Sequence, residues 1–344
     1  MVEVSRDSLV ISFPEIHPHA RLRVTFQRTL RIPDDGKAYP LPPGLGAFPL
    51  RHVDDFAARA PQDWLRRGGV MLPMYQSEAT WLHFAGEHDP EREATYPFAV
   101  KIAAGKINAV TGEGWAEGVT RGPQDYMVVP TQPWLDGFCV EKGFIRQFVA
   151  MPLGGGYSAE EQLTGKAEFG GIQVLVYPMR RDVYERRFPK VDPRFCEEVH
   201  ACEMAAPACA PAGAKSMGLA PGGRMKQEIF RDPYELGDWD LNAKSRCFVH
   251  LCNALAWREI TGENPPTTPF TAKEYTRAGL PWFDWYGGDA AALEGAAKLA
   301  GLKSVAEVAK QKGDATLDDG PITPEKVIQL RAGLRPGQVR EGGW

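Results

Sequence analysis

The clearest pattern of apolar and polar positions lies between residues 20 and 32, where the two kinds of side chain alternate. Val24, Phe26 and Ile32 fall on one face, and polar residues fall on the other. A period of two residues is typical of a strand that buries one face. Arg28 interrupts the apolar face, and a bulge or a position at the sheet edge would explain it.

Other apolar runs predict that the first half of the chain is mostly β-structure. Further strands are expected over residues 9–13, 98–102, 126–129, 144–151 and 172–177. One helix should interrupt them at about residues 53–67, where apolar side chains recur at helical spacing.

After residue 228 the apolar spacing changes to a period near 3.6, which indicates helices. Residues 241–260 predict one long helix that ends at Gly262, ahead of two prolines. A capping box predicts a helix over residues 305–312, and a threonine followed by proline predicts another over 327–331.

These patterns predict an α+β fold. A length of 344 residues favours two domains, since domains cluster near roughly 100 to 200 residues. We expect a β-rich, antiparallel, sandwich-like N-terminal domain over residues 1–190 and an α-helical C-terminal part over 229–344. A loop-rich connector over 191–228 would join them, because the alanine- and proline-rich stretch 205–213 suits a linker.

Composition and charge narrow the class of protein. The chain is 43% hydrophobic and 24% charged, as ordinary globular proteins are. Its net charge of -4 argues against binding nucleic acid by counterion release. No apolar run reaches the roughly 18 residues of a membrane span, and the first residues do not resemble a secretory signal. We therefore expect a soluble, cytoplasmic protein with reduced cysteines.

A cluster of potential metal ligands stands in the expected connector. Cys196, His200, Cys202 and Cys209 fall within fourteen positions and would suffice for a tetrahedral zinc site. Their spacing lacks the paired C-x2-C arrangement of established zinc motifs, so ordinary cysteines in an irregular loop are the alternative.

Two glycine-rich segments are candidates for binding a small anionic ligand. The first, Gly154–Gly156, runs into a capping box and so predicts a helix whose N-terminal amides face the loop and attract anions. The second is Gly222–Lys226, which combines glycines with basic residues. The alternative is a pair of turns. The candidate ligand-binding residues are Gly155, Gly156, Ser158, Gly223, Arg224 and Lys226.

A polar stripe on the expected helix 241–260 is the candidate catalytic group. Arg246, His250 and Asn253 would lie along one side of that helix, where the histidine would act as a base or bind an anion. The alternative is a hydrogen-bonded histidine at the edge of the core.

An aromatic segment carries the other candidate site. Trp282, Trp285 and Tyr286, together with Phe283, place four rings within five positions. Such a segment either binds a ligand or protein partner or clamps the helical part onto the β half.

Two functions follow from these features. The first is a binding or assembly protein that recognises a partner, a ligand or a copy of itself through the aromatic segment. The alternative is an enzyme whose anion or metal site is formed by the glycine-rich loops and the histidine-bearing helix. Convergence of those segments in one pocket separates the two hypotheses.

Overall fold

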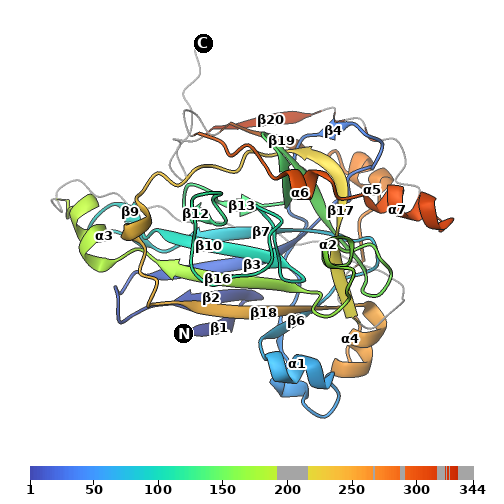
Figure 1. Ribbon diagram of the computed structural model, residues 1–344, viewed down its shortest axis with the longest axis horizontal. Coiled ribbons are helices and arrows are strands. Elements are labelled where there is room, and N and C mark those ends of the chain that lie inside the picture. Colours follow the sequence, from blue (N-terminus) through green and yellow to red (C-terminus); the bar gives the residue numbers. More distant parts are fainter. Residues whose placement is uncertain are drawn as a thin grey trace.

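One large sheet dominates the fold (Figure 1). The computed structural model describes residues 1–191, 216–265, 268–286, 291–315 and 326–331, together with Ile322 and Pro324. Within these residues the sheet has 16 strands. Its main path follows the order β1 (Val2–Ser5), β2 (Ser8–Ser12), β3 (Arg21–Thr29), β7 (Ala79–Gly86), β15 (Phe144–Pro152), β17 (Ser216–Lys226), β18 (Ser245–Cys252), β16 (Ile172–Pro178), β10 (Phe98–Ala104) and β11 (Ile107–Asn108).

Shorter strands pair along this path. They are β4 (Ala38–Tyr39), β5 (Arg51–His52), β6 (Val70–Pro73), β12 (Met127–Val129), β13 (Trp134–Leu135) and β14 (Gly137–Glu141). Neighbours in the large sheet pair antiparallel, except that β4 lies parallel to β17 and β6 lies parallel to β18. Two small sheets stand apart, formed by β8 (His88–Asp89) with β9 (Ala94–Thr95) and by β19 (Trp282–Tyr286) with β20 (Val327–Arg331).

Short helices surround the sheet. They are α1 (Gln62–Arg67), α2 (Ala159–Thr164), α3 (Arg181–Arg187), α4 (Ala254–Thr261), α5 (Ala272–Arg277), α6 (Ala297–Ala300) and α7 (Val305–Lys312), with 3-10 turns at Asp54–Phe56 and Leu236–Asp238. Helices α1 and α4 lie together at the lower end of the molecule in Figure 1 and share a small core around Trp64 and Trp257. In the part of the chain described here, no helix is both long and apolar enough to pass through a membrane.

The main core lies between strands from the two ends of the sheet. Phe26 of β3 and Leu82 of β7 belong to the same buried cluster as Val100 of β10 and Val174 of β16. The sheet therefore folds back on itself, and both of its halves contribute to one core. Because strands buried on both faces lose the polar side of their pattern, several of them read as continuous apolar runs.

The strands expected in the first half of the chain are present, and Arg28 has an explanation that the sequence did not offer. Strand β3 is central, between β2 and β7, and its register with β7 continues unbroken past Arg28. The side chain is buried and its Nε donates a hydrogen bond of 2.9 Å to Oε1 of Glu78, which is also buried. A buried ion pair, and neither a bulge nor a sheet edge, accommodates the arginine.

The prediction of one long helix over residues 241–260 is wrong. Strand β18 occupies Ser245–Cys252, and the shorter helix α4 follows it. The second half of β18 is buried at every position, so side chains on both of its faces are covered and its apolar run resembles a helical one. The strand also pairs with both β16 and β6. Pairing with neighbouring strands overrides local spacing here.

Three further expectations are corrected. The glycine-rich segment 222–226 is part of strand β17 rather than a connector loop. Residues 327–331 form β20, paired with β19, instead of a helix, and their valine and isoleucine favour a strand. The helix expected over 53–67 is split, because a 3-10 turn ends at Phe56 and α1 begins only after Pro61.

The described residues show no separate helical domain in the second half of the chain. Strands β17 and β18 pair with β15 and β16, so the large sheet includes residues from both sides of the expected connector. The domain boundaries at 190 and 228 remain predictions.

Candidate functional site

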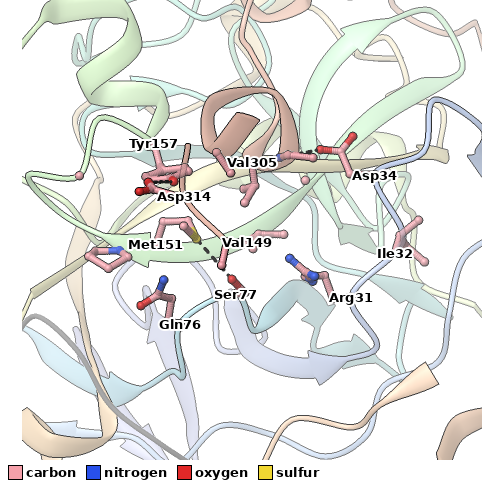
Figure 2. Close-up of a pocket in the computed structure, with 17 residues that line it drawn as sticks. Arg31, Ile32, Asp34, Gln76, Ser77, Val149, Met151, Tyr157, Val305 and Asp314 are labelled. Carbon is pink, nitrogen blue, oxygen red and sulfur yellow. Dashed lines mark hydrogen bonds between the residues drawn. The ribbon is translucent and has the colours of Figure 1, made fainter. Parts of the chain in front are cut away.

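The two glycine-rich segments meet at one cavity of about 600 Å³ (Figure 2). Gly155 reaches it from the loop before α2, and Gly222 and Gly223 reach it from β17. Figure 2 shows Arg31 and Gln76 on one side of this cavity and the pair of Tyr157 and Asp314 on the other. Two of the three segments expected to form a pocket therefore come together.

The backbone donors of the first segment are already engaged by a carboxylate of the chain itself. Glu161 Oε1 accepts hydrogen bonds from the amides of Gly154, at 2.9 Å, and Gly156, at 2.7 Å. Its Oε2 accepts the amide and the hydroxyl of Ser158, at 3.2 and 2.7 Å. The predicted capping box is confirmed. Glu161 therefore occupies the amides of the glycine-rich loop, and the amide of Glu161 itself, in the first turn of the helix, donates to the Ser158 hydroxyl.

Close packing accounts for the glycines of the second segment. A Cβ on Gly222 would lie 2.4 Å from Cγ2 of Val149, and one on Gly223 would lie 2.6 Å from the carbonyl oxygen of Pro33. Glycine is the residue that allows such an approach of two backbones. Arg224 and Lys226 are not among the residues that line the cavity. They form ion pairs with Glu141 and Asp284.

The polar groups around the cavity are also bonded to one another. The Tyr157 hydroxyl donates a hydrogen bond to Asp314. Burial and this hydrogen bond together raise the pKa of Tyr157 to about 12. On the other side, Asp34 accepts the amide of Ala306 at 3.1 Å, near the start of α7. The cavity thus has polar walls, and much of their hydrogen-bonding capacity is used within the chain.

His250 does not reach this cavity. Its side chain is 1% exposed and stacks between the rings of Trp64 and Phe248, at centroid distances of 4.7 and 4.4 Å. Its Nε2 lies 3.0 Å from the carbonyl oxygen of Gly68, and burial lowers its pKa to about 4. A neutral histidine held in this way is a core residue.

The other members of the expected stripe are separated from His250. Arg246 lies on β18 and pairs with the exposed Glu117, with 3.0 Å between Nη1 and Oε1. Asn253 caps α4, since its side chain accepts the amide of Ala256 at 2.8 Å. The structure therefore gives no shared site to the three residues.

The aromatic segment is a strand, and its described side chains have different surroundings. Trp282 is 3% exposed and packs against Tyr39 and Tyr275, at ring-centroid distances of 6.3 and 5.2 Å. Phe283 is half-buried and exchanges two backbone hydrogen bonds of 2.7 Å with Leu41. The side chains of Trp285 and Tyr286 lie outside the described part of the structure.

Phe283 forms one wall of a small apolar pocket, which we name the aromatic groove. Its volume is about 260 Å³. The rings of Trp81 and Trp134 lie against each other nearly edge to face, 6.5 Å apart. The residues that define the groove are Leu41, Pro42, Pro43, Gly44, Trp81, Trp134, Asp136 and Phe283.

Asp136 is the one ionisable residue that lines the aromatic groove, and it is 2% exposed. Its Oδ2 accepts a hydrogen bond of 2.6 Å from Nε2 of Gln227, whose Oε1 in turn accepts the Asp136 amide at 3.0 Å. No described residue donates a hydrogen bond to the other oxygen, Oδ1. Burial raises the pKa of Asp136 to about 7. The groove therefore combines aromatic walls with a carboxyl group that titrates near neutral pH.

The candidate zinc ligands Cys196, His200, Cys202 and Cys209 lie outside the described residues. Within the described ranges, histidine, cysteine and carboxylate side chains form no group of three or more placed to hold a metal ion. The described cysteines, Cys139, Cys247 and Cys252, are free and buried, and burial raises the pKa of their thiols.

No protein-family model matches the chain, and neither a curated protein nor a solved structure matches it.

Sequence reasoning missed the aromatic groove, apart from the segment that contributes Phe283. Trp81 comes from β7, Trp134 from β13 and Asp136 from the link between β13 and β14. Only the segment 134–136, in which a tryptophan stands two residues before an aspartate, is a local signal, and such a spacing is too common to indicate a site.

Proposed function

We propose that the protein is a binding protein that holds an organic ammonium group in the aromatic groove. The observation that carries this proposal is Asp136, a buried carboxyl group at an apolar, aromatic-walled surface with no cation of its own. An ammonium ion would supply the missing positive charge, and its carbon substituents would suit the apolar walls. This develops the hypothesis of recognition through the aromatic segment, with Phe283 as its contribution.

Other buried carboxylates in the described residues have either a counter-charge or several backbone donors, and Asp136 has neither. Glu160, which forms no ion pair with a described residue, accepts the amides of Glu168, Phe169 and Gly170. Glu78 pairs with Arg28. Asp232 pairs with Arg121, with 3.2 Å between Nη2 and Oδ2, and also accepts the indole N–H of Trp239 at 2.9 Å. Because leaving a buried charge unpaired is costly, proteins rarely retain one without a use for it. The contrast supports an external partner for Asp136.

The aromatic walls favour the same chemistry. The face of an indole or phenyl ring carries negative electrostatic potential, and cations with attached methyl groups are bound by such rings. Trp81, Trp134 and Phe283 line the same pocket as Asp136. A neutral apolar ligand would gain burial from the rings but would leave Asp136 unpaired.

One observation supports the alternative hypothesis of an enzyme: Gly155 and Gly223 both line the cavity of about 600 Å³. Two observations weigh against it as a site for a small anion. Glu161 occupies the loop amides, and His250 lies elsewhere. The binding hypothesis is therefore preferred.

Choline and its neutral carbon isostere, 3,3-dimethyl-1-butanol, test the proposal, because they have almost the same shape and differ in charge. Calorimetric titration at pH 8 should show choline binding at least tenfold more tightly than the isostere. Asp136→Asn should remove this preference, whereas Asp63→Asn, a change at an exposed carboxyl on α1, should keep it. Trp134→Ala should weaken both ligands. Equal binding of the two ligands by the unmodified protein would contradict the proposal.

The pH dependence gives a second test. Because the ammonium ion prefers ionised Asp136, choline affinity should fall as pH decreases below about 7, by up to tenfold per pH unit. Affinity should level off above pH 8. A flat profile between pH 5 and 8 would show that Asp136 does not contact the cation.

A further inference from the structure

We propose a second binding site, a basic cleft of about 510 Å³ that takes a small phosphorylated compound bearing a planar ring. It lies away from the aromatic groove and does not depend on the function proposed there. It is formed by α1, the turn between β10 and β11, and β18. The residues that define the basic cleft are Arg66, Arg67, Gly69, Lys106, Trp115, Glu117, Gln173, Val174, Arg246, Cys247 and Phe248.

Cations outnumber acids in this cleft, although the whole chain has a net charge of -4. Four of its lining residues are basic and one, Glu117, is acidic. Glu117 is shared, because Lys244 also pairs with it beside Arg246. Arg67 and Lys106 form no ion pair with any described carboxylate. The uncompensated charge marks the cleft as a site for an anion, and arginine and lysine are both well suited to bind phosphate.

Contacts within the chain fix the position of the Arg67 guanidinium. It lies over the rings of Phe169 and Phe248, at 5.1 and 5.5 Å from their centroids. Its Nη2 donates a hydrogen bond of 2.8 Å to the carbonyl oxygen of Glu168. A guanidinium has five N–H donors, so others remain for a ligand. An arginine that is already positioned loses little conformational freedom when it binds phosphate.

Lys106 stands at a position that favours glycine. It follows Gly105 in the two-residue turn between β10 and β11, with φ of +61°. Such a turn prefers glycine at its second residue, because a side chain in the left-handed region costs backbone free energy. Its ammonium group lies 4.1 Å from the ring centroid of Phe169, which Arg67 also contacts, and both cations line the cleft. A lysine placed there against backbone preference suits a functional role.

Two aromatic side chains give the cleft its preference for a planar ring. Trp115 and Phe248 both line it, and neither ring is fully buried. The ring of Phe248 stacks on His250, at a centroid distance of 4.4 Å. A planar ring would stack on Trp115 or Phe248 while an attached phosphate binds Arg67 and Lys106. A nucleotide carries both of these groups.

The probes are ADP, pyrophosphate and adenosine, titrated calorimetrically into the full-length protein at low salt. ADP should bind, and pyrophosphate and adenosine should each bind at least tenfold more weakly. Raising the ionic strength from about 0.05 to 0.2 M should weaken ADP binding several-fold, because part of the interaction is screened. No ADP binding at millimolar concentration, or equal binding of ADP and adenosine, would overturn the proposal. So would an oligonucleotide that binds more tightly than ADP.

The decisive variant is Lys106→Gly, for which a structural role and a ligand role predict different results. Glycine suits the turn, so the melting temperature should not fall, while ADP affinity should drop at least tenfold. Arg246→Gln, at an exposed position, should also reduce ADP affinity without loss of stability. Lys310→Gln, on the exposed side of α7, is the matched control and should change neither. Unchanged ADP affinity in both Lys106→Gly and Arg246→Gln would refute the site.

Discussion

Asp136→Asn should make the folded protein more stable above pH 7, although it alters the proposed binding site. Burial raises the pKa of Asp136 from 3.8 to about 7. The folded state therefore holds this proton more tightly than the unfolded chain. The stability that the group contributes is present below pH 4 and is lost as the pH rises to 7 and beyond.

The size of the effect follows from the same pKa values. At roughly 1.4 kcal/mol per pH unit, a rise from 3.8 to about 7 corresponds to about 4 kcal/mol at pH 8. Relaxation and water entry reduce the cost of burying a charge, so we expect about 2 to 4 kcal/mol. Asparagine keeps the shape of the side chain and can still accept the hydrogen bond from Gln227.

Urea unfolding, followed by tryptophan fluorescence at pH values from 4 to 8, measures this difference. The unfolding free energies of Asp136→Asn and the unmodified protein should be similar at pH 4 and should diverge as pH rises. Other titrating groups are common to both proteins and cancel in the difference. Saturating choline should narrow the gap at pH 8 by stabilising only the unmodified protein. A variant that is less stable at pH 8, or a difference independent of pH, would refute the argument.

Three further predictions concern the core and the metal. Phe26→Ala on β3 should lower the unfolding free energy by about 3 to 5 kcal/mol, and Thr25→Ala by less than half of that; equal losses in urea unfolding would contradict the inward orientation of Phe26. Trp282→Ala should cost about 3 to 5 kcal/mol, since its ring is buried; an unchanged melting curve would show that this ring is not part of the core. If the cysteine cluster binds zinc, about one equivalent should co-purify by elemental analysis and be lost in Cys202→Ser with a lower melting temperature. Absence of zinc from the purified protein would contradict that hypothesis.

The sequence predicted strands best where one face of the strand is distinct from the other. Strand β3 shows this, because the even positions from Leu22 to Arg28 are all buried, although Thr25 and Thr29 on the other face are buried as well. Prediction failed at β18, where burial on both faces replaces alternation with a continuous apolar run. It failed again at β20, since pairing with β19, a partner distant in the sequence, decides that conformation. Local spacing does not contain these long-range contacts.

Long-range contacts also limited the prediction of the candidate sites. The condition for an enzyme site was that both glycine-rich segments and the His250 stripe meet in one pocket, and the structure brings only the two glycine-rich segments together. The capping box, which the sequence did show, predicts that Glu161 accepts the Ser158 amide, but it does not predict the hydrogen bonds to the amides of Gly154 and Gly156. The pairing of Trp134 with Trp81, by contrast, depends on strands far apart in the chain. No short motif could have predicted it.

Asp136 and Lys106 share a property that distinguishes a functional residue from a structural one. Each stands where another residue would suit the fold better, an uncharged side chain at the buried position and glycine at the turn with positive φ. Residues selected for stability should destabilise the protein when replaced, whereas residues retained for binding should stabilise it and reduce affinity. Opposite signs for stability and binding, measured on the same two variants, are therefore a stronger test than either quantity alone. If both variants were destabilised, the buried carboxyl and the strained lysine would be structural, and both proposed sites would lose their main support.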